Sequence, residues 1–165
     1  MDHLWAPWRM SYIGAAAGPT PPACIFCVPG EEAGEDRDRL IVHRAEGAFT
    51  LLNCYPYNPG HLMVAAYGHG GDLAQMDVSA WGAVAAEVQL ATRVVAETLR
   101  CDGFNGGWNQ GRVAGAGFEG HLHVHLVPRW AGDTNFMPVL ADVKVVPEHL
   151  DVTRDRLAEA FRGRS

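Results

Sequence analysis

Three histidines, His121, His123 and His125, stand at alternate positions in the stretch HLHVHLVPRW, with apolar residues between them. Alternation of this kind is typical of a β-strand, in which successive side chains point to opposite faces, so the three imidazoles are expected to share one face. Neighbours on one face of a strand stand about 6.5–7 Å apart. Such a row can bind a metal ion, can form a relay in which one imidazole attacks and its neighbours orient it, or can only satisfy hydrogen bonds on a half-buried strand.

The segment before the histidines is rich in glycine. Its sequence is NQGRVAGAGFEG, residues 109–120, and it runs directly into the histidine row. Glycines let backbone N–H groups converge on an anion without obstruction by side chains. A glycine-rich segment is also typical of an ordinary flexible connection. Beside three histidines, however, it favours a phosphate cradle next to a nucleophile.

A pair of cysteines near the start of the chain has the spacing of zinc ligands. Cys24 and Cys27 form a CxxC motif, and two further ligands must come from elsewhere. His69, just past a strand-like run, and His121, at the start of the histidine row, are the candidates. We predict a structural zinc site of the Cys2His2 type, with a reduced pair that holds no metal as the alternative. The other two cysteines, Cys54 and Cys101, are expected to be plain buried residues.

Aromatic residues near these motifs are candidates for ligand contacts. Trp130 follows Pro128 and Arg129 directly and is the better candidate. The N-terminal stretch HLWAPWRMSYI, residues 3–13, is expected to pack on the core or on a second subunit.

The composition limits the kinds of partner. The chain has 165 residues, 48% of them hydrophobic, which suits one folded domain with a sizeable core. A formal net charge of −6 argues against a broad surface for nucleic acid or anionic membrane. Residues 1–20 lack the pattern of a signal peptide, and no apolar run is long enough to span a bilayer. We therefore expect a cytoplasmic protein with a small-molecule ligand.

The elements that must position these residues follow from the hydrophobic pattern. Strand-like runs stand at 39–44, 48–53, 61–66 and 103–109, and the histidine row supplies a fifth that Pro128 is expected to end. A long helix is predicted at about 79–100 and a last helix at about 148–162. Residues 28–39 are interpreted as a polar loop. The fold class is therefore α+β, a mostly antiparallel sheet of about five strands with one long helix and a C-terminal helix.

The pattern HLHVHLVPR resembles the histidine triad (HIT) family, in which histidines alternate with apolar residues. The resemblance covers most of the chain and includes the family's first signature, here Asn53 followed by Pro59-Gly60-His61. It implies a HIT-like fold and a single domain over residues 1–165, with an N-terminal segment at 1–38, a core at 39–130 and a C-terminal extension at 131–165. It also implies a homodimer. Bacterial members with a CxxC motif often bind zinc, and the matching ligands here are Cys24, Cys27, His69 and His121.

More narrowly, the motifs around the triad look like the bacterial diadenosine polyphosphate phosphorylase-like branch of the family, which is ATP adenylyltransferase-like. Many HIT hydrolases carry a glutamine in the loop before the triad, whereas this chain has Ala114-Gly115-Ala116-Gly117. Backbone amides near residues 116–118 are therefore expected to hold the phosphate. The resemblance implies an adenine nucleotide as substrate. Because Ala116 and Gly117 offer no side-chain donor to order a water and leave space for an anion, inorganic phosphate, rather than water, is the expected acceptor.

The resemblance also implies roles for single residues. His123 is the expected nucleophile, with its Nδ1–H held by a backbone carbonyl; His125 contacts the phosphoryl or bridging oxygen, and His61 braces the row. The expected substrate-binding residues are Asn53, Asn109, Gln110, Ala116, Gly117, Phe118 and Trp130. The attack itself needs no metal. Cleavage through a nucleotidyl-histidine is the leading hypothesis, with a phosphoramidate or polyphosphate hydrolase and a non-catalytic nucleotide sensor as alternatives.

Overall fold

The computed structural model describes residues 24–28, 33–133 and 148–164. The N-terminal aromatic stretch lies outside these ranges, as does most of the C-terminal extension before its helix. Within the described ranges, no helix combines the length and the apolar character needed to cross a membrane.

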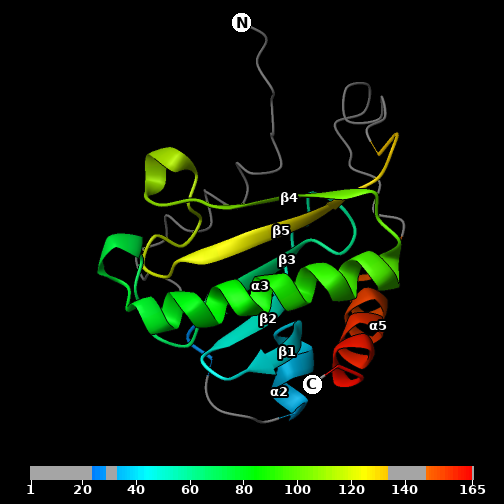
Figure 1. Ribbon diagram of the computed structural model, residues 1–165, viewed down its shortest axis with the longest axis horizontal. Helices are drawn as coiled ribbons and strands as arrows, with labels where there is room; N and C mark the ends of the chain where they lie inside the picture. Colours follow the sequence, from blue (N-terminus) through cyan, green and yellow to red (C-terminus); the bar gives the residue numbers. More distant parts are fainter. Residues whose placement is uncertain (1–23, 29–32, 134–147, 165) are drawn as a thin grey trace, which may run out of the picture.

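Five strands form one sheet (Figure 1). They are β1 (Ile41–Ala45), β2 (Ala48–Leu52), β3 (Leu62–Ala66), β4 (Gly103–Trp108) and β5 (His123–Arg129). Their order is β1-β2-β3-β5-β4, and all four neighbouring pairs are antiparallel. Each strand lies within about two residues of its predicted bounds, so the α+β class with five strands is confirmed.

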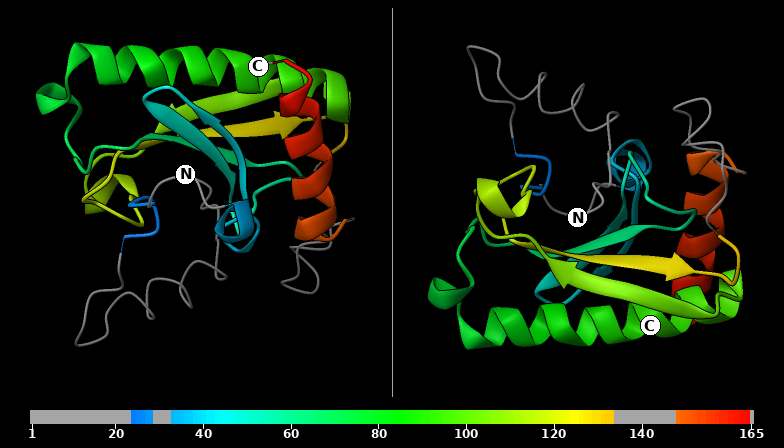
Figure 2. Two further views of the ribbon diagram at one scale, coloured as in Figure 1. Left: turned by 90° about the horizontal axis from the view of Figure 1, so that it is seen from below. Right: turned by 90° about the horizontal axis from the view of Figure 1, so that it is seen from above.

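One face of the sheet is covered by helices. The long helix α3 (Val78–Leu99) lies across β2, β3 and β5, and α5 (Leu150–Arg162) packs against β1 and α3 (Figure 2). The core between them contains buried leucines and valines from both layers, among them Leu52, Leu62 and Val94. The apolar spacing of the sequence predicts both helices, and both are confirmed.

The prediction that Pro128 ends the histidine strand is wrong, because β5 continues to Arg129. Pro128 stands opposite Phe104 of β4, and its carbonyl accepts from the side-chain amide of Asn58 on the other side at 3.0 Å. The nitrogen of a strand residue points to the same side as its carbonyl, away from β4 here. Pairing of β5 with β3 has already ended at Leu126, so the missing N–H of the proline breaks no ladder bond.

Two further expectations about local structure are corrected. The supposed polar loop at 28–39 contains a short helix, α2 (Ala33–Asp38). Cys54 is exposed and Cys101 is only half-buried, so the expectation that both are plainly buried is wrong.

The two faces of β5 have different chemistry. Val124 and Leu126 pack in the cores next to α3. The side chains of His123 and His125 point to the opposite face and stand beside Ala65 and Met63 of β3. His121 lies just before the strand begins. The histidines therefore lie on the face of the sheet opposite α3, as the alternation predicts.

The turn before β3 needs its glycine. Gly60 has a φ of +74°, a conformation that side chains with a Cβ rarely adopt, and a Cβ at this position would collide with the Leu99 side chain. The Pro-Gly-His sequence thus packs against the end of α3 and delivers His61 to the start of β3.

Candidate active site

His123 is held in one tautomer. Its Nδ1 lies 2.9 Å from the carbonyl oxygen of His121, and since a carbonyl can only accept, Nδ1 carries the proton. This is the carbonyl contact expected from the sequence. The lone pair therefore lies on Nε2. Burial lowers the pKa of His123 from its ordinary value and outweighs the opposing effect of the carbonyl, so the ring stays neutral and nucleophilic near pH 7.

The imidazoles of His61 and His125 are linked by a hydrogen bond whose direction is set by the backbone of Tyr57. The backbone N–H of Tyr57 donates to Nδ1 of His61 at 3.1 Å, which places the proton of that ring on Nε2. Nε2 of His61 in turn lies 3.0 Å from Nδ1 of His125 and donates to it. The proton of His125 therefore lies on its own Nε2. The rings of His123 and His125 are edge to face, with centroids 4.9 Å apart.

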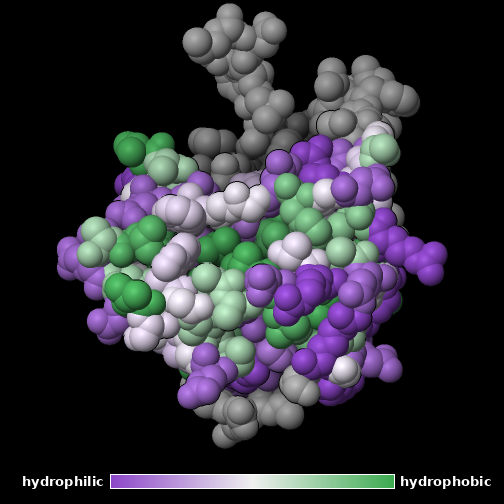
Figure 3. Space-filling model, in the orientation of Figure 1, coloured by the Kyte–Doolittle hydropathy of each residue, from purple (hydrophilic) through white to green (hydrophobic). Residues whose placement is uncertain are grey.

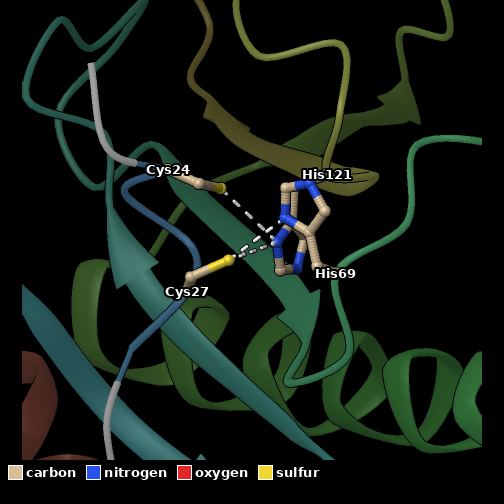
Figure 4. A group of neighbouring side chains, drawn as sticks. All are labelled: Cys24, Cys27, His69 and His121. Carbon is tan, nitrogen blue, oxygen red and sulfur yellow. Dashed lines mark hydrogen bonds between the residues drawn. The ribbon is translucent and has the colours of Figure 1, made fainter. Parts of the chain in front are cut away.

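The four predicted zinc ligands come together (Figure 4). Their ligand atoms all lie within 4.8 Å of one another. Nδ1 of His121 is 3.6 Å from Sγ of Cys24 and 3.9 Å from Sγ of Cys27, and Nδ1 of His69 is 3.1 Å from Sγ of Cys27. We call these four residues the thiol–imidazole cluster. It joins three segments that are more than forty residues apart from one another in the sequence.

The thiol–imidazole cluster has the chemistry of a zinc site. A tetrahedral zinc ion, with Zn–S of about 2.3 Å and Zn–N of about 2.0 Å, separates neighbouring sulfur and nitrogen ligands by about 3.5 Å. The observed sulfur–nitrogen distances bracket this value. Nε2 of His121 donates to the carbonyl of Ala66 at 2.9 Å, so its Nδ1 has a lone pair that faces the thiols. A carbonyl behind a histidine ligand is the usual way in which the ligand's orientation is fixed.

The loop that carries His69 is tied to the start of the histidine row. The N–H of Leu122 donates to the carbonyl of Gly70 at 2.7 Å, and a Cβ on Gly120 would press on the His69 ring. A Cβ on Gly71 would collide with the carbonyl of Glu119. These close approaches explain why glycine stands at positions 71 and 120.

Phe26 is a site residue that the sequence-based prediction missed. It stands between the two cysteines, is fully buried, and stacks on the ring of His123 with centroids 4.4 Å apart and planes 22° apart. Its ring also contacts those of His121 and Phe118. An apolar residue inside a CxxC motif is the signal that could have suggested a core role. That its partner is a catalytic candidate required the three-dimensional structure.

The expected substrate-binding residues come from three parts of the chain: the end of β2, the segment between β4 and β5, and the residue after β5. Asn53 lies beside His61 and accepts from the N–H of Tyr55 at 2.9 Å. Phe118 lies near Phe26. Asn109, Ala116 and Gly117 belong to the segment between β4 and β5, where Arg112–Ala114 form a short 3-10 helix.

Two of the residues expected to contact the ligand form hydrogen bonds within the protein, and a third lies far from the histidines. The side chain of Gln110 bonds to Asp72 and to the N–H of Leu73, at 2.8 and 3.2 Å. The N–H of Ala116 donates to the carbonyl of Gly111 at 3.3 Å. Trp130 stands one residue past the end of β5 and seven residues from His123, roughly 23 Å for an extended chain. Its indole N–H donates to the backbone carbonyl of Arg100. The structure does not bring Trp130 to the histidines.

The chain belongs to the HIT family, because the HIT domain matches residues 35–132 and a relative shares well over 30% of its residues. That relative, an AP-4-A phosphorylase from Mycobacterium tuberculosis, is 39% identical over 162 residues, which cover 96% of this chain and 83% of the relative. Imidazoles in tandem, a tautomer fixed by a carbonyl and an adjacent histidine donor are the features expected of such a family.

Two solved structures share the fold. One is a Zn-bound histidine triad family protein from Mycobacterium smegmatis, with a TM-score of 0.65 and 24% identity, over 86% of this chain and 94% of that one. The other is a hypothetical histidine triad nucleotide-binding protein from Sulfolobus tokodaii, with the same score and identity, over 85% of this chain and 93% of that one. At this identity the likeness supports the fold.

Proposed function

We propose that the protein cleaves dinucleoside polyphosphates by transferring a nucleotidyl group first to His123 and then to inorganic phosphate. The observation that carries the proposal is the bond from Nδ1 of His123 to the carbonyl of His121, which leaves the lone pair on Nε2 of a buried, neutral imidazole. The name of the mycobacterial relative, an AP-4-A phosphorylase, supports this substrate class and this acceptor.

The first step exchanges one bond for another at phosphorus. Nε2 of His123 attacks the α-phosphorus, an N–P bond forms, and the bond from phosphorus to the bridging oxygen breaks with its electron pair on that oxygen. The leaving group is a nucleoside polyphosphate. His125 carries its proton on Nε2, as set by His61, and donates a hydrogen bond to the bridging oxygen as charge develops there.

The second step returns the free imidazole. An oxygen of inorganic phosphate attacks the nucleotidyl phosphorus, the N–P bond breaks, and a nucleoside diphosphate leaves. Amides of the loop before the triad hold the phosphoryl oxygens, and a donor of this kind commonly contributes about 3–4 kcal/mol to a transition state. Because the amide of Ala116 already has an acceptor, we assign this role to the amide of Gly117 and those that follow.

The identity of the acceptor is tested by product analysis. With diadenosine tetraphosphate, phosphorolysis yields ADP plus ATP, whereas hydrolysis yields AMP plus ATP or two ADP. We expect AMP as the main new product without phosphate to give way to ADP when millimolar phosphate is added. Anion-exchange chromatography of the products, with sulfate at equal ionic strength as the control, gives the ratio. An AMP yield that is unchanged by phosphate would contradict phosphorolysis and favour the hydrolase alternative.

The proposed metal is a structural zinc ion held by the thiol–imidazole cluster. With four protein ligands the site has no open position, so the metal would stabilise the fold and supply no reacting group. All four cysteines are unpaired thiols, which fits the reducing cytoplasm in which we place the protein.

Removal of the two thiols should remove the metal. We expect about one zinc per chain in the wild type and less than a tenth of that in Cys24→Ser/Cys27→Ser, with a Tm lower by roughly 10 °C because a tightly bound ligand is lost. Elemental analysis and thermal unfolding measure both quantities. Cys101→Ser is the matched control and should keep its zinc; zinc retained in the double variant would refute the ligand assignment.

We also place two copies of the chain together in a homodimer. The outer edge of β4 pairs with no other strand among the described residues. Trp108 at its end is 45% exposed and packs edge to face on Trp81 of α3. Figure 3 shows apolar side chains in a band over this side of the molecule. A strand edge beside an exposed tryptophan favours pairing with a second copy.

A further inference from the structure

We propose that Phe26 is a positioning residue for the nucleophile and that the Cys24–Cys27 turn couples metal binding at the thiol–imidazole cluster to the orientation of the His123 ring. The proposal rests on the proposed function, since it takes His123 to be the nucleophile. It adds a role for the metal-binding turn beyond stabilising the fold.

The hydrogen bond to the His121 carbonyl does not fix the His123 ring by itself. One bond at Nδ1 leaves the imidazole able to swing about χ2, a torsion that is intrinsically broad for histidine. A swing moves Nε2 away from the line of attack on phosphorus. A second restraint on the plane of the ring is therefore needed.

Phe26 supplies that restraint. Its ring lies nearly parallel to the His123 ring at a centroid distance of 4.4 Å, while the ring of His125 meets His123 at its edge. Phe26 is itself immobilised, because it is fully buried among Phe49, Met63 and their neighbours on the histidine face of the sheet. The stack fixes the imidazole plane, and the carbonyl fixes its rotation within that plane.

The turn that presents Phe26 ends in two metal ligands. Its backbone hydrogen bonds in the described structure stay within the turn: Cys27 N–H to Cys24 at 3.1 Å and Val28 N–H to Phe26 at 3.0 Å. The turn is thus held to the sheet by side chains, with Phe26 in the middle and thiols on both sides. Figure 4 shows the two thiols directed at the imidazoles of His69 and His121. A metal that joins these four groups would hold the Phe26 ring in its place over His123.

Kinetics of Phe26→Leu test the positioning role. Leucine keeps an apolar side chain but offers no ring plane, so we expect kcat to fall about 10- to 100-fold, as misorientation of a reacting group does, with KM changed less than threefold. Zinc content should stay near that of the wild type. Phe26→Met serves as a second variant if Phe26→Leu folds poorly.

Two controls separate positioning from loss of stability. Ile25→Ala alters the neighbouring, exposed residue of the same turn and should leave kcat unchanged. Phe49→Leu removes another fully buried ring of the same cluster, whose ring contact is with Tyr67, and should lower Tm without a matching loss of kcat. A kcat for Phe26→Leu equal to that of Ile25→Ala, or a loss shared by Phe49→Leu at equal Tm, would overturn the proposal.

Coupling between the metal and the His123 ring can be measured without turnover. The quantity is the rate at which diethyl pyrocarbonate modifies His123, determined by peptide mass spectrometry. His123 is only 5% exposed, so the zinc-loaded wild type should react slowly. Chelation should raise the rate several-fold in the wild type and leave the already faster Phe26→Leu unchanged. Equal rates before and after chelation in the wild type would overturn the coupling. Failure of the proposed function would instead appear as a wild type without turnover and without a nucleotidyl adduct, whatever the state of Phe26.

Discussion

Replacement of His123 by alanine is expected to lower kcat for diadenosine tetraphosphate by at least about a thousandfold, the usual scale for loss of a covalent nucleophile. Neither neighbouring histidine of the described strand region can take over the attack: His125 has its proton on Nε2, and Nδ1 of His121 faces the thiols. Binding of the substrate should change only a few-fold, because we assign its binding to loop amides and Asn53 rather than to the nucleophile.

Steady-state kinetics and isothermal titration with a mononucleotide measure these two quantities. His149→Ala is the matched control, since this histidine is exposed and lies before α5, away from the site. A His123→Ala variant with more than a few per cent of wild-type kcat would show that the nucleophile is misassigned. Loss of both binding and turnover would indicate misfolding, which circular dichroism would reveal.

His125 and His61 are expected to act in series. His125→Ala should lower kcat by about a hundredfold, because it removes a donor to the oxygen on which charge develops. His61→Leu should lower kcat by about tenfold, since without the 3.0 Å bond from His61 the tautomer of His125 is no longer fixed. His61 is thus a positioning residue, whereas His125 touches the substrate.

A double-mutant cycle distinguishes the series arrangement from two independent roles. If His61 acts through His125, the double variant should be no slower than His125→Ala alone. Multiplied losses, about a thousandfold in total, would contradict this chain of hydrogen bonds. The Tm of each variant provides the control, because His61 is fully buried and its replacement can destabilise the fold.

Most of the fold follows from local patterns in the sequence. Alternation predicts the strands and the shared face of His123 and His125, and apolar spacing predicts α3 and α5. The continuation of β5 through Pro128 does not follow, because it depends on where β3 stops pairing. The burial of Glu87 on α3 also depends on residues far away in the sequence. Its carboxylate accepts hydrogen bonds from Nδ1 of His43 at 2.8 Å and from the Thr50 hydroxyl, which belong to two different strands.

The sequence predicts most residues of the candidate site but not all of their contacts. Residue types and the family motif suggest the histidines and the thiol–imidazole cluster, since each is identified by its own chemistry. The stacking of Phe26 on His123, the amide of Tyr57 behind His61 and the use of Gln110 within its own loop come from tertiary packing. None of the three has a signature in the residue type, because phenylalanine, a backbone amide and a surface glutamine occur in many settings.

Detection of the covalent intermediate tests directly whether His123 is the nucleophile. The protein is mixed with diadenosine tetraphosphate in phosphate-free buffer, quenched in alkali within milliseconds to seconds, since phosphoramidates survive base, and analysed by intact mass and peptide mapping. We expect a mass increase of one AMP residue, located on His123. This adduct should disappear, with release of ADP, when phosphate is added before the quench. Turnover without any adduct on His123, or an adduct on another residue, would contradict the assignment of His123 as the nucleophile.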